Sequence, residues 1–152
     1  MNCNPEEMSV TPTHTILIVE DDKEECALIS RIISTPTTKV DTALDGAAAI
    51  NNINHQLYDL ILLDLHLPRV TGMEVLAHVK SYAGITPVII LTGSMDVRSA
   101  VEAMKCGAYD YLTKPFTEDE LKIVMARALE FRSLRNSVTL TERSREWLMD
   151  DE

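Results

Sequence analysis

The sequence is poor in cysteine and in long apolar runs, and each shortage excludes a class of protein. Its three cysteines, Cys3, Cys26 and Cys106, are odd in number and form no Cys-x-x-Cys pair. This pattern argues against a disulfide framework or a zinc site and favours a reducing compartment. Apolar runs end far short of the ~20 residues that a membrane-spanning helix needs. Residues 1–14 are polar and carry two glutamates, which is not the pattern of a signal peptide.

Basic residues are also scarce. Lysine and arginine total 14 against 24 aspartates and glutamates, which gives a formal net charge of -10. Such a chain is poorly suited to bind nucleic acid or an anionic membrane, although an acidic balance often serves solubility alone. The length of 152 residues suits one domain with a filled core. We expect a cytoplasmic protein with a flexible arm at 1–13, a domain at 14–134, and a C-terminal extension or start of a linker at 135–152.

Two kinds of segment alternate after residue 14. Apolar, often β-branched stretches predict strands, and the strongest three are continuous blocks, typical of strands buried on both faces of a parallel sheet. The predicted strands are 16–19, 39–42, 60–63, 88–91 and 109–112. Segments with helical spacing follow each of them. They span 22–34, begin at Asp45, follow Thr71-Gly72, span 96–107, and begin at Thr117.

Residues at the helix ends support these assignments. Asp45 suits an N-cap, Gly107 suits the residue after a helix, and Thr117 with Glu120 forms a capping-box pattern. A βα unit repeated five times predicts an α/β fold, a doubly wound five-stranded parallel sheet of order 2-1-3-4-5. In such sheets ligands bind beyond the carboxyl ends of the strands, between strands 1 and 3. Functional residues are therefore expected at that edge.

Carboxylates follow two strands that this order makes neighbours. Glu20, Asp21 and Asp22 come directly after strand 1, and Asp64 ends strand 3. Clustered carboxylates repel one another unless a cation is present, and a donor set of oxygens alone favours Mg²⁺. The triplet by itself could equally cap the first helix, where acidic residues interact favourably with the helix dipole. Asp64 on the neighbouring strand favours the magnesium site.

Asp64 also suggests a reaction, because a carboxylate beside a metal can attack phosphorus. Thr92, at the end of strand 4, and Lys114, after strand 5, could each contact a phosphoryl oxygen. Taken singly, each is more often an ordinary polar residue, and only their joint position supports a site. Gly93 leaves space beside Thr92, and a cis bond before Pro115 would direct Lys114 toward the site.

With these residues in this order, the sequence resembles the receiver domain of two-component response regulators, a CheY-like family. The resemblance covers about residues 14–134, in the family's order and spacing. The matching stretches are ILIVEDD (16–22), YDLILLDLHLP (58–68), TGME (71–74), PVIILTG (87–93) and GAYDYLTKPF (107–116). Each is weak alone, and together they are specific.

The resemblance implies a phosphorelay switch and not a conventional enzyme. Asp64 matches the phosphoacceptor, and Glu20, Asp21, Asp64 and the backbone carbonyl of His66 match the Mg²⁺ ligands. Glu20 replaces the commoner aspartate, and its longer side chain favours contact through water. The side chain of His66 is expected to be a variable residue at the rim, because no second histidine or cysteine lies at ligand spacing.

The remaining matches concern switching. Thr92 and Lys114 match the residues that sense the phosphoryl group, and Tyr111 matches the aromatic residue that turns inward with Thr92. Side chains at His66 and Ser94 would influence the phosphoryl lifetime. A histidine kinase or a histidine phosphotransfer protein would be the donor. The surface of the fourth helix, fifth strand and fifth helix would bind a downstream protein or an effector domain outside this chain.

Three other classes of protein fit the sequence less well. A flavodoxin-like flavin or nucleotide binder needs a Gly/Ser/Thr-rich loop after strand 1, where this chain has acidic residues 20–25. A metal-dependent phosphatase with an aspartate nucleophile resembles the site but usually has a second aspartate where His66 stands. An inert adaptor would not need Asp64, Thr92 and Lys114 together. A near-heptad from residue 121 to 138 leaves two arrangements open, a homodimer through the fifth helix or packing of that helix onto the body.

Overall fold

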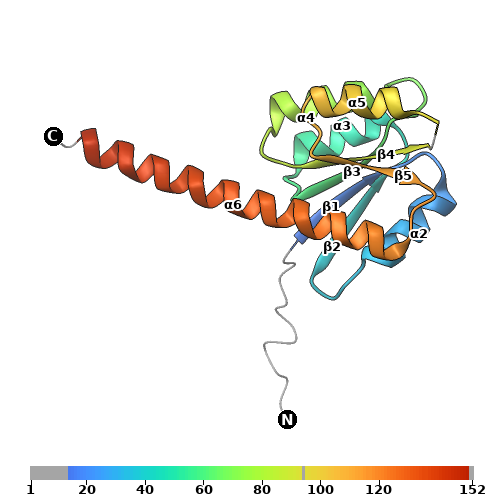
Figure 1. The fold of residues 1–152 in the computed structure, drawn as a ribbon, viewed down its shortest axis with the longest axis horizontal. Coiled ribbons are helices and arrows are strands. Elements are labelled where there is room, and N and C mark those ends of the chain that lie inside the picture. Colours follow the sequence, from blue (N-terminus) through green and yellow to red (C-terminus); the bar gives the residue numbers. More distant parts are fainter. Residues whose placement is uncertain (1–13, 94, 151–152) are drawn as a thin grey trace, which may run out of the picture.

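The computed structural model describes residues 14–93 and 95–150, with side chains described as far as residue 134. Figure 1 shows one twisted sheet between two layers of helices, and a last helix that continues beyond the sheet. The strands are β1 (His14–Val19), β2 (Thr38–Ala43), β3 (Leu60–Asp64), β4 (Val88–Gly93) and β5 (Asp110–Lys114). The helices are α2 (Lys23–Ile33), α3 (Gly46–His55), α4 (Gly72–Tyr82), α5 (Val97–Lys105) and α6 (Glu118–Asp150).

The predicted sheet is confirmed. All strand pairs are parallel and their order is β2-β1-β3-β4-β5. In the register, Val19 pairs with Leu63 and Asp64 pairs with Leu91, so β1, β3 and β4 end at nearly the same level. Residues that follow these strands therefore meet at one edge.

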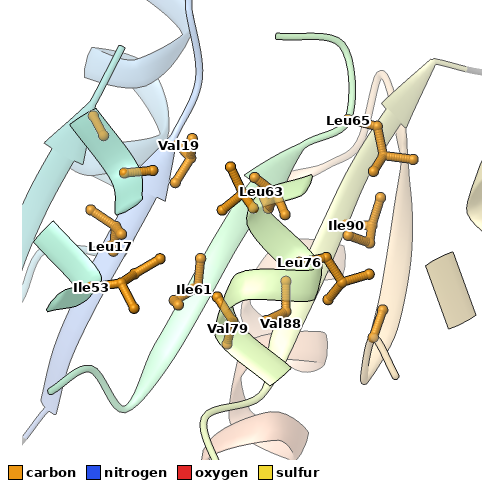
Figure 2. Close-up of a cluster of buried hydrophobic side chains, with 14 of the residues drawn as sticks. Leu17, Val19, Ile53, Ile61, Leu63, Leu65, Leu76, Val79, Val88 and Ile90 are labelled. Atoms are coloured by element: carbon orange, nitrogen blue, oxygen red, sulfur yellow. The ribbon is translucent and has the colours of Figure 1, made fainter. Parts of the chain in front are cut away.

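Two hydrophobic clusters explain the continuous apolar strands. Leu17, Val19 and alternate residues of β3 and β4 face α3, α4 and α5, in the cluster that Figure 2 shows. Ile16, Ile18 and the intervening residues face α2 and α6. Because helices cover both faces, neither set of side chains meets water, and the central strands β1, β3 and β4 carry continuous apolar blocks.

Most helix ends are those that the sequence predicts. The Asp45 carboxylate accepts a hydrogen bond from the backbone N of Ala48 at 2.7 Å, and Gly107 has the left-handed φ of 106° after α5. The Thr117 hydroxyl accepts from the backbone N of Glu120 at 3.1 Å. Asp96 precedes α5 without a side-chain capping bond to the helix backbone, and its carboxylate forms an ion pair with His66.

Helix α6 is a single helix of 33 residues and includes residues 135–150. Where it passes the amino-terminal edge of the sheet, Arg132 forms an ion pair with Asp59 at 3.1 Å, and Phe131 packs on Tyr109 with ring centroids 5.0 Å apart. The domain boundary at residue 134 stays a prediction, and the proposed arm at 1–13 lies outside the described residues. None of the described helices has both the length and the apolar character needed to cross a bilayer.

Candidate functional site

Three carboxylates meet at the carboxyl edge of the sheet. Glu20 and Asp21 follow β1, and Asp64 ends β3. One carboxylate oxygen from each residue lies within 4.8 Å of the other two. Asp22 is outside this cluster, because its carboxylate caps α2 and accepts from the backbone N of Glu24 at 2.9 Å. The capping interpretation is confirmed for Asp22, and the magnesium site at Glu20 and Asp21 stays a prediction.

Glu20 is the most unusual member of the cluster, because its carboxylate is almost fully buried. Burial raises the pKa of Glu20 from 4.5 to about 7, the hydrogen bond from Lys114 opposes this shift, and the charge of Asp64 adds to it. A buried carboxylate beside two others is costly without a partner cation. An all-oxygen cluster of this charge fits a hard divalent ion such as Mg²⁺, with Glu20, Asp21 and Asp64 as protein ligands.

Lys114 supplies a positive charge to the same edge. Its Nζ lies 2.9 Å from Glu20 Oε2, 3.0 Å from Glu25 Oε1 and 3.8 Å from Asp64 Oδ2. Burial alone would lower the pKa of Lys114, but the hydrogen bonds to Glu20 and Glu25 and the charge of Asp64 raise it. The ammonium therefore stays charged at neutral pH. The peptide bond between Lys114 and Pro115 is cis, as the sequence suggested.

Asp64 has one oxygen held and the other facing the cluster. Its Oδ1 accepts from the backbone N of His66 at 3.0 Å, and its Oδ2 lies on the side of Lys114. The side chain of Thr92 is buried, and among the described residues its hydroxyl makes two long contacts of 3.5 Å, to the carbonyl oxygens of Gly93 and Asp96. A Cβ added to Gly93 would meet no described atom within 4 Å. The edge beside Thr92 is thus open.

Two predicted residues lie apart from the carboxylates. The side chain of Tyr111 is 39% exposed, so in this structure it is not packed inward. The imidazole of His66 is exposed and its Nε2 lies 2.5 Å from Asp96 Oδ2, which places this ring outside the three-carboxylate cluster. The pKa of Asp96 is lowered chiefly by a hydrogen bond with Ser99, and His66 adds to the effect. Ser94 lies outside the described residues.

Sequence reasoning missed two of these partners. The contact of Glu25 with Lys114 was not predicted, although the position of Glu25 in the first turn of α2, beside the acidic triplet, was a signal. The pairing of His66 with Asp96 joins two loops that follow different strands. Nothing in the local sequence indicates it.

Known proteins are similar to this chain in sequence. The profile of the family described as "Response regulator receiver domain" matches residues 16–126. The regulatory protein AtoC of Escherichia coli K12 is 33% identical over 129 residues, which are 85% of this chain and 28% of AtoC. The transcriptional regulatory protein DltR of Streptococcus agalactiae is 40% identical over 106 residues, which are 70% of this chain and 47% of DltR.

A solved structure extends the likeness to three dimensions. The receiver domain of NtrX from Brucella abortus is 35% identical and superposes with a TM-score of 0.72, covering 76% of this chain and 98% of that domain. The chain thus spans less than half the length of the two regulators above but matches nearly all of an isolated receiver domain. The protein belongs to the response regulator receiver domain family.

Proposed function

We propose that the protein accepts a phosphoryl group on Asp64, in a Mg²⁺-dependent reaction, from a phosphohistidine on a histidine kinase or a histidine phosphotransfer protein. The observation that carries this proposal is the convergence of Glu20, Asp21 and the Lys114 ammonium around the buried carboxylate of Asp64. The rim of a parallel sheet offers these groups to a ligand from one side. Apart from its own phosphorylation and dephosphorylation, the domain would act as a switch and not as an enzyme.

The chemistry follows from Asp64 Oδ2, the oxygen that does not accept the hydrogen bond from the backbone N of His66. Its Oδ2 attacks the phosphorus, a new O–P bond forms, and the P–N bond to the donor imidazole breaks, so that the imidazole leaves with the electron pair. Bound Mg²⁺ would neutralise negative charge on the phosphoryl oxygens. Besides the three carboxylates, the backbone carbonyl of His66 is the further ligand we assign. Lys114 and the weakly engaged hydroxyl of Thr92 would then hold two phosphoryl oxygens.

Output would pass through the surface of α5, β5 and α6. When Thr92 moves toward the phosphoryl group, Tyr111 turns inward and changes this surface, on which Val97 and Val101 are already exposed. A target that prefers the phosphorylated form must stabilise that form by the same free energy. The target would be a separate cytoplasmic protein or an effector domain joined through residues 135–152, and not nucleic acid or a membrane. A homodimer through the face of α6 that carries the exposed Leu134 would be compatible with a separate target protein and with a joined effector domain.

The proposal is tested by labelling. Incubation of the chain with Mg²⁺ and acetyl phosphate is expected to add the mass of one phosphoryl group, and EDTA should prevent this addition. Hydroxylamine should remove the group, because it cleaves an acyl phosphate but leaves a phosphate ester on serine or threonine intact. The proposal would be wrong if neither acetyl phosphate nor phosphoramidate labelled the folded chain.

Metal binding should depend on pH through Glu20. A folded-state pKa of about 7, above the ordinary 4.5, means that the folded, metal-free protein gains stability as pH falls through 7 toward 4.5. Protons and Mg²⁺ then compete for this carboxylate. We expect the apparent Mg²⁺ affinity to be about tenfold lower at pH 6 than at pH 8, since a ligand must lose its proton to bind metal.

Calorimetric titration of Mg²⁺ at the two pH values checks this prediction. Glu20→Gln serves as the control, because its amide does not titrate, and it should flatten the pH dependence while lowering the affinity. Equal affinities of the native chain at pH 6 and pH 8 would contradict the assignment of Glu20 as a ligand.

A further inference from the structure

Lys114 is held by a carboxylate that does not come from the sheet edge. Glu25 belongs to the first turn of α2, and its Oε1 lies 3.0 Å from Lys114 Nζ, about as close as Glu20 Oε2 at 2.9 Å. The backbone N of Glu25 also donates to the Asp22 carboxylate at 3.3 Å, which ties this turn to the acidic segment. The side chain is only partly exposed, at 30%. Glu25 is therefore close enough to hold the Lys114 ammonium by a direct ion pair.

The distances show which carboxylates Lys114 favours. Its ammonium is within hydrogen-bonding distance of Glu20 and Glu25, but 3.8 Å from Asp64 Oδ2, which is beyond a direct hydrogen bond. Glu20 is deeply buried and needs a positive partner. Glu25 reaches solvent, so its charge is not obliged to pair with the lysine. The ion pair between Glu25 and Lys114 is thus the one that can break at the lower cost in free energy.

We infer that Glu25 is a positioning residue that holds Lys114 on the α2 side of the site while Asp64 is unphosphorylated. The inference rests on the proposed function, in which Lys114 moves to a phosphoryl oxygen on Asp64. That movement breaks or lengthens the contact with Glu25. An interaction that is stronger in the unphosphorylated form stabilises that form, so Glu25 slows phosphoryl uptake and limits the occupancy of the phosphorylated state.

The test compares three variants by their rates of labelling with acetyl phosphate at saturating Mg²⁺. Glu25→Gln removes the charge, and Glu25→Asp keeps the charge on a side chain one methylene shorter, which cannot reach Lys114 Nζ without movement. Both are expected to label about twofold to fivefold faster than the native chain, the range that a partly exposed ion pair supplies. Their melting temperatures should stay close to that of the native chain, which separates positioning from a general loss of structure.

Glu24→Gln is the matched control. Glu24 occupies the same turn and donates its backbone N to the same Asp22 carboxylate, but it is exposed and the described ion pairs join Lys114 to Glu20, Glu25 and Asp64. This variant should label at the native rate. Equal acceleration by Glu24→Gln and Glu25→Gln would assign the effect to net charge and overturn the inference, as would a native or slower rate in Glu25→Gln. Absence of labelling in the native chain would instead refute the proposed function itself.

Discussion

Asp64→Asn is expected to abolish labelling by acetyl phosphate completely. The amide is not a nucleophile toward phosphorus under these conditions, and its oxygen can still accept the 3.0 Å hydrogen bond from the backbone N of His66. Replacement of the negative charge also removes a repulsion that raises the pKa of Glu20. Without Mg²⁺ the variant should therefore melt at or above the native temperature. Intact mass and a thermal melt measure the two effects.

Asp22→Asn provides the matched control for this loss. It removes one negative charge from the same acidic segment, and asparagine caps a helix about as well as aspartate, so α2 should keep its first turn. This variant should accept one phosphoryl group as the native chain does. If Asp64→Asn were labelled to the same extent as the native chain, the phosphoacceptor would lie elsewhere and the proposed chemistry would fail.

The strands and their order could be predicted because burial on both faces requires continuous apolar blocks, which are easy to recognise in the sequence. The block from Leu60 to Leu63 is apolar at every position, since alternate residues pack on α3 and α4 or on α2 and α6. Once such blocks alternate with helices, short right-handed crossovers leave few topologies. The approach of Glu20 and Asp64 then follows from the register, in which β1 and β3 end together.

Contacts between loops could not be predicted in this way. Whether Glu25 reaches Lys114 depends on the direction in which the chain turns at Pro115 and on the rotamers of two long side chains. The sequence rule that acidic residues favour the start of a helix assigns Glu25 to the helix dipole and says nothing about a partner. The ion pair between Asp59 and Arg132 is similar, because it joins residues far apart in the chain at the opposite edge of the sheet.

The residue at which α6 ends could not be predicted, for a different reason. Its buried positions, such as Leu121 and Ala128, follow the periodicity of a helix packed on a sheet. Beyond Phe131 the apolar residues are sparse, and a near-heptad alone left a homodimer and packing onto the body as alternatives. Helix propensity without a packing surface is a weak guide to where a helix ends. The continuation of α6 to Asp150 in the structure is therefore a finding that the sequence left open.

Gly72→Ala is expected to have the second large effect, through steric conflict with the strand that carries Asp64. A Cβ on Gly72 would lie 2.5 Å from Leu65 Cα and 2.7 Å from the Asp64 carbonyl oxygen. Both are backbone atoms, so no rotamer change relieves the clash. Overpacking of this kind costs about 3 kcal/mol, which lowers the melting temperature by about 10 °C. The backbone shift also displaces the Asp64 carboxylate, and a displacement of about 1 Å can slow the reaction about 100-fold.

Gly93→Ala separates the effect of the clash from the loss of a glycine near the site. A Cβ on Gly93 would meet no described atom within 4 Å, so this variant should melt close to the native temperature. A thermal melt of both variants and a labelling time course for Gly72→Ala measure the prediction. Because α4 begins at Gly72 and β3 ends at Asp64, native stability and a native labelling rate in Gly72→Ala would mean that this helix and this strand do not jointly position the phosphoacceptor.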